Sequence, residues 1–239
     1  MASAEGGPAG DIAWKVHSAA SRAEVVFLLG ERRDALQVTV ALFGRRLRRW
    51  EFAGLAGAPD DARVEIGTLA GDLYLEMHHG LPDRYCEFLF VRRAGDGPVL
   101  VNDGLRIHRE TMQRNGLGLR IFCRQTCQAK ALGVRRIEVT AGRGRAENGY
   151  YTWPRFGMDG PLPATVTEML PPGLRSARSV LDLIQSEPGR WWWKAHGCRV
   201  DLAFDLSEGS RCWRVFQAYL RSRLGTGCRD GGNRPAAIE

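Results

Sequence analysis

The chain has 239 residues, 44% of them hydrophobic, and a formal net charge of +7 with a pI near 9.4. It is long enough to bury one good core, and no stretch approaches the roughly 18 uncharged apolar residues that a membrane helix needs. The first ten residues lack the basic start and the apolar centre of a signal peptide. We therefore expect a cytoplasmic protein that does not enter a membrane.

We expect one folded domain between two tails. Residues 1–22 are rich in Gly and Ala and predict a flexible tail, and the polar, Gly-rich residues 226–239 predict another. Residues 23–225 suit a single domain with an insertion better than two independent domains. The insertion is predicted at residues 159–197, where prolines and tryptophans are concentrated.

Six cysteines are spread over the chain: Cys86, Cys123, Cys127, Cys198, Cys212 and Cys228. They form no CxxC pair and follow no secretory signal, a pattern typical of reduced thiols rather than a disulfide framework. Cys123 and Cys127 stand one helical turn apart, but no second pair of ligands lies near them, so we expect no metal. We interpret the cysteines as small buried hydrophobic residues.

The first hundred residues are predicted to be rich in strands. Residues 35–43 alternate apolar and polar side chains, which predicts a strand, and residues 47–52 predict its hairpin partner across a basic turn. Further strands are predicted at residues 64–69, 73–77, 85–91 and 99–101.

A helix is predicted over residues 116–132. Five apolar residues recur there at spacings of three and four: Leu119, Phe122, Cys123, Cys127 and Ala131. Gly133 supplies a C-terminal stop. Residues 105–110 before the helix and 134–141 after it predict strands. The order strand, helix, strand favours a right-handed crossover that places these two strands side by side.

The C-terminal third is predicted to contain a helix at 179–185, a strand at 200–204 and a last helix capped by Asp205 or Ser207. Three consecutive tryptophans, Trp191–Trp193, would point in different directions on a helix. We therefore expect at least one of them in the core, and we favour core packing over a ligand role.

The positive charge is concentrated in one stretch. Between Gln113 and Arg145 there are eight lysines and arginines and one acid, and eight minus one equals the net charge of the whole chain, +7. A local basic field favours a ligand that carries phosphate or a nucleic-acid backbone. The alternative is a solvated helix face, which is how most Arg-rich helix surfaces are used.

A glycine-bearing turn, Gln113–Gly118, separates the strand at 105–110 from the helix. Unpaired backbone N–H groups converge at the start of a helix, where the helix dipole adds about half a positive charge, so such a turn can bind phosphate. Gly116 and Gly118 allow tight backbone geometry and close approach of a ligand. The spacing fits neither a P-loop nor a dinucleotide-binding GxGxxG motif.

This pattern, Gln113-x-x-Gly116-x-Gly118 between a strand and a helix, resembles the pyrophosphate loop of the GNAT superfamily of N-acyltransferases. Residues 148–158 are similar to the next block of that family, in which an Asn precedes a short helix. The resemblance implies an α+β fold with a mixed, mostly antiparallel sheet and helices packed on both faces. It also implies that Arg106 to Glu110 form a strand that splays from its neighbour and pairs with the arm of acetyl-CoA.

The resemblance implies a set of site residues. Those expected to bind acetyl-CoA or another acyl-CoA are Ile107, His108, Arg109, Gln113, Arg114, Asn115, Gly116, Leu117, Gly118 and Asn148. Those expected in catalysis are Glu110, Tyr150 and Tyr151. Trp153 stands where the family often has the tyrosine that protonates the departing thiolate, so Tyr150 or Tyr151 would have to act instead.

Three functions follow from these features. The first is transfer of an acetyl or longer acyl group from acyl-CoA to an amine, with Glu110, His108 or a water chain as the base. The second is a GNAT-like domain that binds CoA or a partner without turnover. The third is a nucleic-acid-binding module that uses the basic stretch. The sequence does not identify the acceptor amine.

Overall fold

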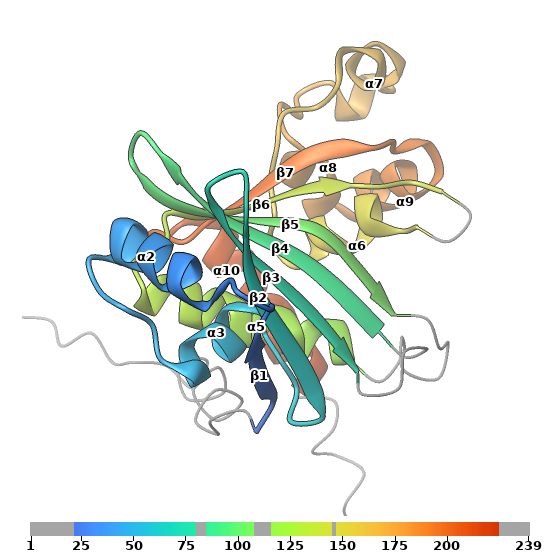
Figure 1. Ribbon diagram of the computed structural model, residues 1–239. Coiled ribbons are helices and arrows are strands. Elements are labelled where there is room, and N and C mark those ends of the chain that lie inside the picture. The colour runs from blue at the N-terminus through green and yellow to red at the C-terminus, as the bar shows by residue number, and fades with distance from the viewer. Residues whose placement is uncertain (1–21, 80–84, 108–115, 145–146, 225–239) are drawn as a thin grey trace, which may run out of the picture.

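The computed structural model describes residues 22–79, 85–107, 116–144 and 147–224 (Figure 1). Its centre is a seven-stranded sheet whose strands follow one another in chain order. The strands are β1 (Glu24–Phe27), β2 (Ala62–Leu69), β3 (Asp72–His79), β4 (Tyr85–Ala94), β5 (Gly97–Ile107), β6 (Arg136–Ala141) and β7 (Val200–Asp205). The pairs β1/β2 and β5/β6 are parallel and the other neighbours antiparallel, so the predicted mixed, mostly antiparallel sheet is confirmed.

Eight α-helices and one 3₁₀ turn lie within the described residues. They are α2 (Arg32–Phe43), α3 (Arg49–Leu55), α5 (Leu117–Ala131), α6 (Gly149–Arg155), α7 (Ala164–Met169), η1 (Pro172–Leu174), α8 (Val180–Gln185), α9 (Glu187–His196) and α10 (Arg211–Leu224). Together with the sheet they make an α+β fold. No helix of the described part is long and apolar enough to cross a membrane.

The hairpin predicted at residues 35–52 is wrong, because this segment folds as α2 and α3. Apolar residues at every second position of α2 imitate a strand, yet Ala35 and Thr39, one helical turn apart, are the residues that it buries. Gly44 then ends α2 in a left-handed conformation (φ 72°), with its N–H donating to the carbonyl of Val40. The start of α3 is fixed by Glu51, whose carboxylate accepts from the Arg48 N–H at 2.7 Å.

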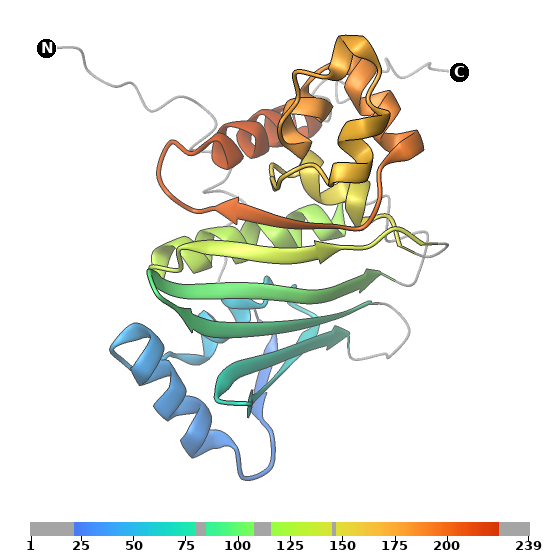
Figure 2. The ribbon, with the colours of Figure 1, turned by 90° about the horizontal axis from the view of Figure 1, so that it is seen from above.

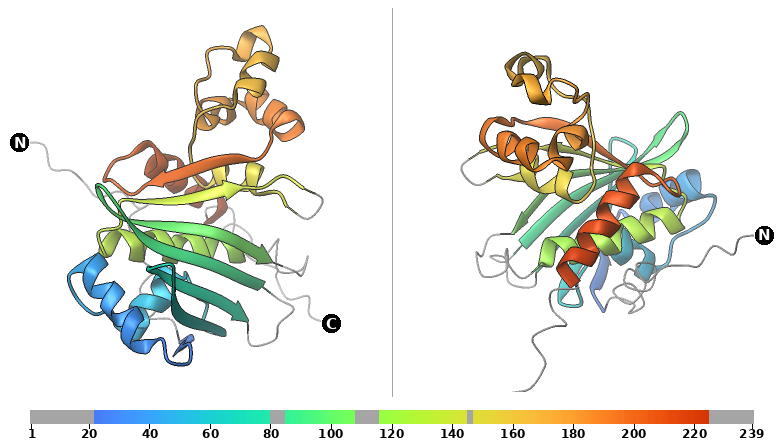
Figure 3. Two further views of the ribbon diagram at one scale, coloured as in Figure 1. Left: turned by 45° about the horizontal axis from the view of Figure 1, so that its top comes forward. Right: turned by 180° about the vertical axis from the view of Figure 1, so that it is seen from behind.

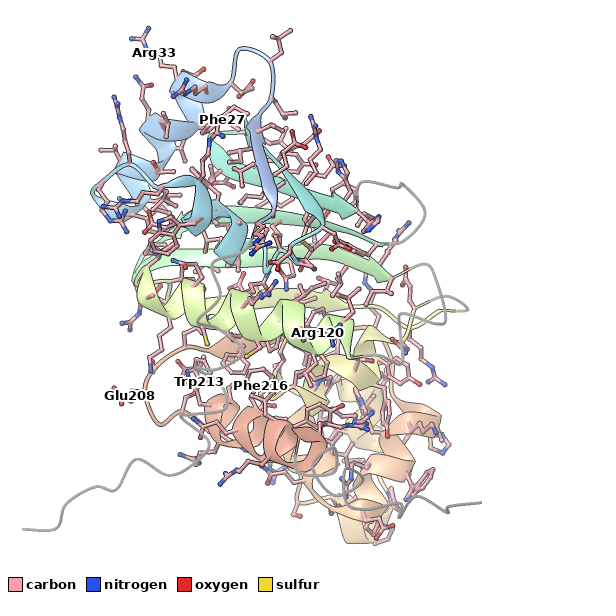
Figure 4. The ribbon with its side chains drawn as sticks, turned by 90° about the horizontal axis from the view of Figure 1, so that it is seen from below. Phe27, Arg33, Arg120, Glu208, Trp213 and Phe216 are labelled. Carbon is pink, nitrogen blue, oxygen red and sulfur yellow. The ribbon has the colours of Figure 1, made fainter. Side chains whose placement is uncertain are left out.

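One face of the sheet carries most of the core. Alternate residues of β2, β3 and β4 are buried, and from below the molecule α3 and α5 lie across the strands with α10 beside them (Figure 4). Phe122 of α5 is fully buried and has four aromatic neighbours: Trp153, Phe156, Phe204 and Phe216. These rings join α5, α6, β7 and α10 into one core.

The opposite face of the sheet combines polar pairs with half-buried rings such as Phe88 and Phe90 of β4. The residues of β6 that point away from α5 form contacts with neighbouring strands, such as Glu138 with Arg92 at 2.8 Å and Thr140 with Asp201 at 2.7 Å. In Figure 2, no described helix lies in front of β4 or β5 on this side. The expected helix packing on both faces is therefore not seen over these strands, and an antiparallel sheet can leave one face to solvent.

The insertion at 159–197 is anchored at the outer edge of the sheet. Asp159 pairs its backbone with Ala203 of β7, and its carboxylate accepts from the Ser179 hydroxyl and the Leu181 N–H, both at 3.0 Å. Trp193 is fully buried and its Nε1 donates to the Tyr150 carbonyl at 2.8 Å. The prediction that at least one tryptophan of the triplet is core is thus confirmed.

The predicted helices at 116–132 and 179–185 and the strand at 200–204 are confirmed with small shifts of their ends. The last helix also forms, but its cap is Ser210, whose hydroxyl oxygen accepts from the Trp213 N–H at 3.3 Å. Asp205 instead accepts from the Ser207 N–H. The predicted tails lie outside the described residues except for Arg22, whose N–H donates to Asp60.

Candidate functional site

Strands β5 and β6 separate part of the way along. Their parallel register ends at Asn102 opposite Val139, whereas β5 stays paired with β4 as far as Ile107 opposite Tyr85. Within the described residues, β5 beyond Asn102 therefore pairs with β4 alone. A bulge marks the same place, because Asp103 is an extra residue between two successive pairs of β5 with β4. Strand 134–141 was predicted beside 105–110; it lies beside 99–102 instead.

The glycine turn places the start of α5 near the end of β5. Gly116 has a left-handed backbone (φ 70°), and its carbonyl accepts from the Arg120 N–H at 3.0 Å. Gly118, in the first turn, faces Ile107, since a methyl group there would contact the Cδ1 atom of Ile107 at 3.5 Å. The first turn of α5 contains no acidic residue. The positive end of the helix dipole is therefore not neutralised locally.

Four of the predicted acyl-CoA-binding residues come together at this point. Ile107 ends β5, Gly116 precedes α5, and Leu117 and Gly118 begin it. Six other predicted residues lie outside the described part of the chain: His108, Arg109, Glu110, Gln113, Arg114 and Asn115. The site as described is thus a scaffold of backbone around the end of β5 and the start of α5.

The predicted residues of α6 face a different neighbour. The Tyr150 hydroxyl donates to the Lys194 carbonyl of α9 at 2.9 Å, and the Tyr151 ring lies 5.9 Å from the Lys194 ammonium. Asn148 immediately precedes α6 and accepts from the Thr152 hydroxyl at 3.2 Å. These contacts hold both tyrosines against α9, and none of the described contacts joins them to β5.

Trp153 belongs to the core. It is 7% exposed, and its ring centroid lies 5.4 Å from that of Phe122 and 5.9 Å from that of Phe156. A packing residue therefore stands at the position where the resemblance implied a catalytic tyrosine.

A buried polar cluster lies where β5 leaves β6, and sequence reasoning did not identify it as a site. Asn102 donates to the side-chain oxygen of Gln125 on α5 at 2.9 Å, and Gln125 donates to Glu87 of β4 at 3.4 Å. All three side chains are buried, Glu87 completely. Glu87 Oε2 and Asn102 Oδ1 have no hydrogen-bond partner among the described residues. A signal for this cluster was present in the sequence, because Glu87 stands between Tyr85 and Leu89 on the same face of a predicted strand.

The environment of Glu87 favours its protonated form. Burial raises the pKa of this carboxyl to about 8, and the hydrogen bond from Gln125 opposes the shift. A carboxyl that titrates near neutrality can give or accept a proton at physiological pH. A carboxyl whose neutral form is favoured therefore lies inside the core, next to the point of strand separation.

The first turns of α5 also line a small pocket of about 210 Å³ together with the loop between α3 and β2. Asp61 of that loop accepts from the Tyr85 hydroxyl at 3.2 Å and contacts His79 Nε2 at 3.0 Å. Arg124 of α5 donates to the Ala58 carbonyl at 2.8 Å. These contacts fix the loop to β3, β4 and α5, so a structural role accounts for them.

The described cations of the basic stretch do not form one patch. Arg124 binds the α3–β2 loop, Arg136 binds Glu138 at 2.7 Å, and Arg143 donates to the Ala195 carbonyl at the end of α9 at 2.8 Å. Lys130 lies 5.4 Å from the Trp213 ring centroid. The described cations of this stretch are thus distributed over separate contacts, which does not favour a nucleic-acid site built from it.

Within the part of the chain that the structure describes, no three His, Cys, Asp or Glu side chains are grouped so as to hold a metal ion. Comparison of the sequence with protein-family models and with curated proteins found no match.

Proposed function

We propose that the protein is an acyltransferase that moves an acetyl or longer acyl group from acyl-CoA to an amine. The observation that carries the proposal is the separation of β5 from β6 after Asn102, directly before a glycine turn and the start of α5. An extended arm with amide groups can add to the open side of a strand. A pyrophosphate can bind at a helix N-terminus. The open side of β5 comes first along the chain and the N-terminus of α5 follows, which suits the extended arm and the pyrophosphate of one CoA molecule.

The reaction assigned to this site has a simple balance. The nitrogen of a neutral amine attacks the thioester carbonyl, the new C–N bond forms and the C–S bond breaks. A base takes the proton of the amine, and the departing thiolate receives a proton from an acid. Glu110 or His108 is the proposed base. Tyr150 or Tyr151 is the proposed acid, because a neutral phenol hydroxyl can give its proton to a departing thiolate.

A CoA-binding domain without turnover is the second candidate. It is favoured by the contacts of α6, where Trp153 is packed in the core and the Tyr150 hydroxyl is already bonded to the Lys194 carbonyl. A hydroxyl proton in such a bond is directed away from any thiolate. The two candidates share a binding site and differ in what happens to the thioester.

Calorimetric titration with acetyl-CoA tests the site. Changing both Gly116 and Gly118 to valine should abolish binding, because side chains would occupy the space of the pyrophosphate and Gly116 would be strained at φ 70°. Gly118→Ala is the milder variant, since the fold leaves room for its methyl group at 3.5 Å from Ile107; it should still weaken binding.

The matched control is Gly133→Val, which places the same side chain at a similar φ of 76° just after the other end of α5. It should bind acetyl-CoA as the wild type does. Equal affinity in the folded double-valine variant would exclude the site. Release of free thiol with a panel of amines then separates the two candidates. A loss above tenfold in Tyr150→Phe or Tyr151→Phe supports catalysis, and binding without thiol release in the wild type supports the second candidate.

A further inference from the structure

Three helices on one side of the molecule carry a continuous row in which aromatic rings alternate with cations. The row consists of Trp191 and Lys194 from α9, Tyr151 and Arg155 from α6, and Tyr219 and Arg223 from α10. Successive members lie 5.2–5.9 Å apart, measured from cation to ring centroid. Seen from behind, α6, α9 and α10 lie together on this side (Figure 3). We call these six side chains the aromatic–cation row.

The row is a product of helix geometry and of helix packing. Within each helix the ring and the cation are three or four residues apart, so they fall on the same face. The helices are then joined by two contacts, Lys194 with the Tyr151 ring at 5.9 Å and Arg155 with the Tyr219 ring at 5.2 Å. The fully buried Trp193 anchors α9 from beneath by its bond to the Tyr150 carbonyl. The helices that carry the row are therefore held together by buried side chains.

The charge around the row is positive. Helices α6, α9 and α10 contain seven lysines and arginines and one carboxylate, Glu187. One of the seven, Arg211 at the start of α10, is paired with Asp159 and Asp182 and does not contribute to the row. Among the described residues, no ion pair involves Lys194 or Arg155. At one end of the row Trp191 is 63% exposed, an unusual position for so large an apolar ring. The surface therefore offers cations next to one exposed ring, Trp191, and two half-buried rings, Tyr151 and Tyr219.

We propose that the aromatic–cation row binds single-stranded nucleic acid. Unpaired bases stack on aromatic side chains, and the phosphates between them are attracted to cations. The alternation of ring and cation matches the alternation of base and phosphate along a strand. A duplex would engage only the cations, because its bases are stacked on one another. This surface differs from the basic stretch at 114–145, and the inference does not depend on the proposed acyl transfer.

An anionic membrane is the competing partner for a basic aromatic surface, and the helix faces argue against it. A helix that lies in a membrane surface exposes its apolar face. Here the apolar faces are used internally, since Trp193 of α9 and both Phe216 and Leu220 of α10 are buried. Trp191, Lys194 and Arg223 remain exposed, and the half-buried Tyr151, Arg155 and Tyr219 lie between them, an alternation that suits a strand of bases and phosphates.

Fluorescence anisotropy with a labelled 15-nucleotide RNA of mixed sequence tests the proposal, with the same sequence as a duplex for comparison. The wild type should bind the single strand more tightly than the duplex. Trp191→Ala and Tyr219→Leu should each weaken binding about fivefold to 100-fold, because each removes one stacking platform. Lys194→Gln should lower the slope of log affinity against log salt by about 0.7, the value for one phosphate contact on a single strand.

The matched controls are Trp50→Ala and Arg49→Gln on α3, which remove another exposed tryptophan (48% exposed) and another exposed arginine away from the row. They should bind the RNA as the wild type does. No binding of the single strand, equal binding of the duplex, or equal losses in the controls would each overturn the proposal. Binding to phosphatidylserine vesicles without binding to the RNA would overturn it as well. The variant with valine at Gly116 and Gly118 should keep full RNA binding, which separates this result from the acetyl-CoA test.

Discussion

Two residues of α5, three positions apart, face opposite kinds of core. Phe122 is surrounded by the rings of α6, β7 and α10, whereas Gln125 joins the buried polar groups of Glu87 and Asn102. Burial of rings stabilises the fold, while burial of a carboxyl with an oxygen that lacks a partner costs stability. The costly region is the one where β5 leaves β6. Stability and the polar cluster therefore depend on neighbouring positions of the same buried face of α5.

The largest effect on stability is expected in the aromatic core around Phe122. Phe122→Ala should lower the free energy of unfolding by about 3–5 kcal/mol, because the substitution leaves a cavity among four rings. Urea denaturation measures the change. Phe90→Ala is the control, since Phe90 is only half-buried on the opposite face of the sheet, and it should cost clearly less. Equal losses would show that the rings around Phe122 do not form the main core.

The next effect is a pH dependence of stability that arises from the buried Glu87 carboxyl. The pKa of Glu87 is raised to about 8 in the folded state, against about 4.3 in an unfolded chain. Between these values unfolding releases a proton, so stability should fall by about 1.4 kcal/mol per pH unit. Below pH 4 the group is protonated in both states, and above pH 8 it is ionised in both, so the effect levels off.

Glu87→Gln removes this titration. The variant should match the wild type at pH 4 and exceed its stability by a few kcal/mol at pH 8. Denaturation at pH 4, 6 and 8 gives the comparison. A difference that is independent of pH would contradict a buried, neutral Glu87 carboxyl.

The smallest effect is expected from the residue that joins the polar groups. Gln125→Leu should lower stability by about 1–3 kcal/mol, because it leaves the Asn102 amide without its acceptor and Glu87 without its donor. Thr126→Val is the control. Its buried hydroxyl bonds only to carbonyls of its own helix, at 2.9 and 3.0 Å, so its loss should change stability by less than about 1 kcal/mol. If the Gln125 variant loses no more stability than this control, the hydrogen bonds from Asn102 to Gln125 and from Gln125 to Glu87 do not stabilise the fold.

The local sequence pattern was sufficient to predict an element where the pattern was compatible with only one secondary structure. The helix α5 follows from apolar spacing and two flanking glycines, and β3 and β4 follow from period-two alternation, because these signals depend only on residues close in sequence. The same rule gave the wrong structure at α2, where Val38 and Val40 imitate a strand. That segment became a helix because Ala35 and Thr39 pack inward and Gly44 ends it, and packing overrides weak propensity.

The sequence by itself determined that a glycine turn separates a strand from a basic amphipathic helix, since glycine freedom and apolar spacing are local properties. Only the tertiary structure decided where β5 parts from β6, because the register depends on residues more than thirty positions apart. The buried cluster joins Glu87 to Gln125 over 38 positions, and the aromatic–cation row joins Tyr151 to Tyr219 through Arg155. No local pattern encodes such distant contacts. They form when separate amphipathic elements bury their apolar faces against the same sheet.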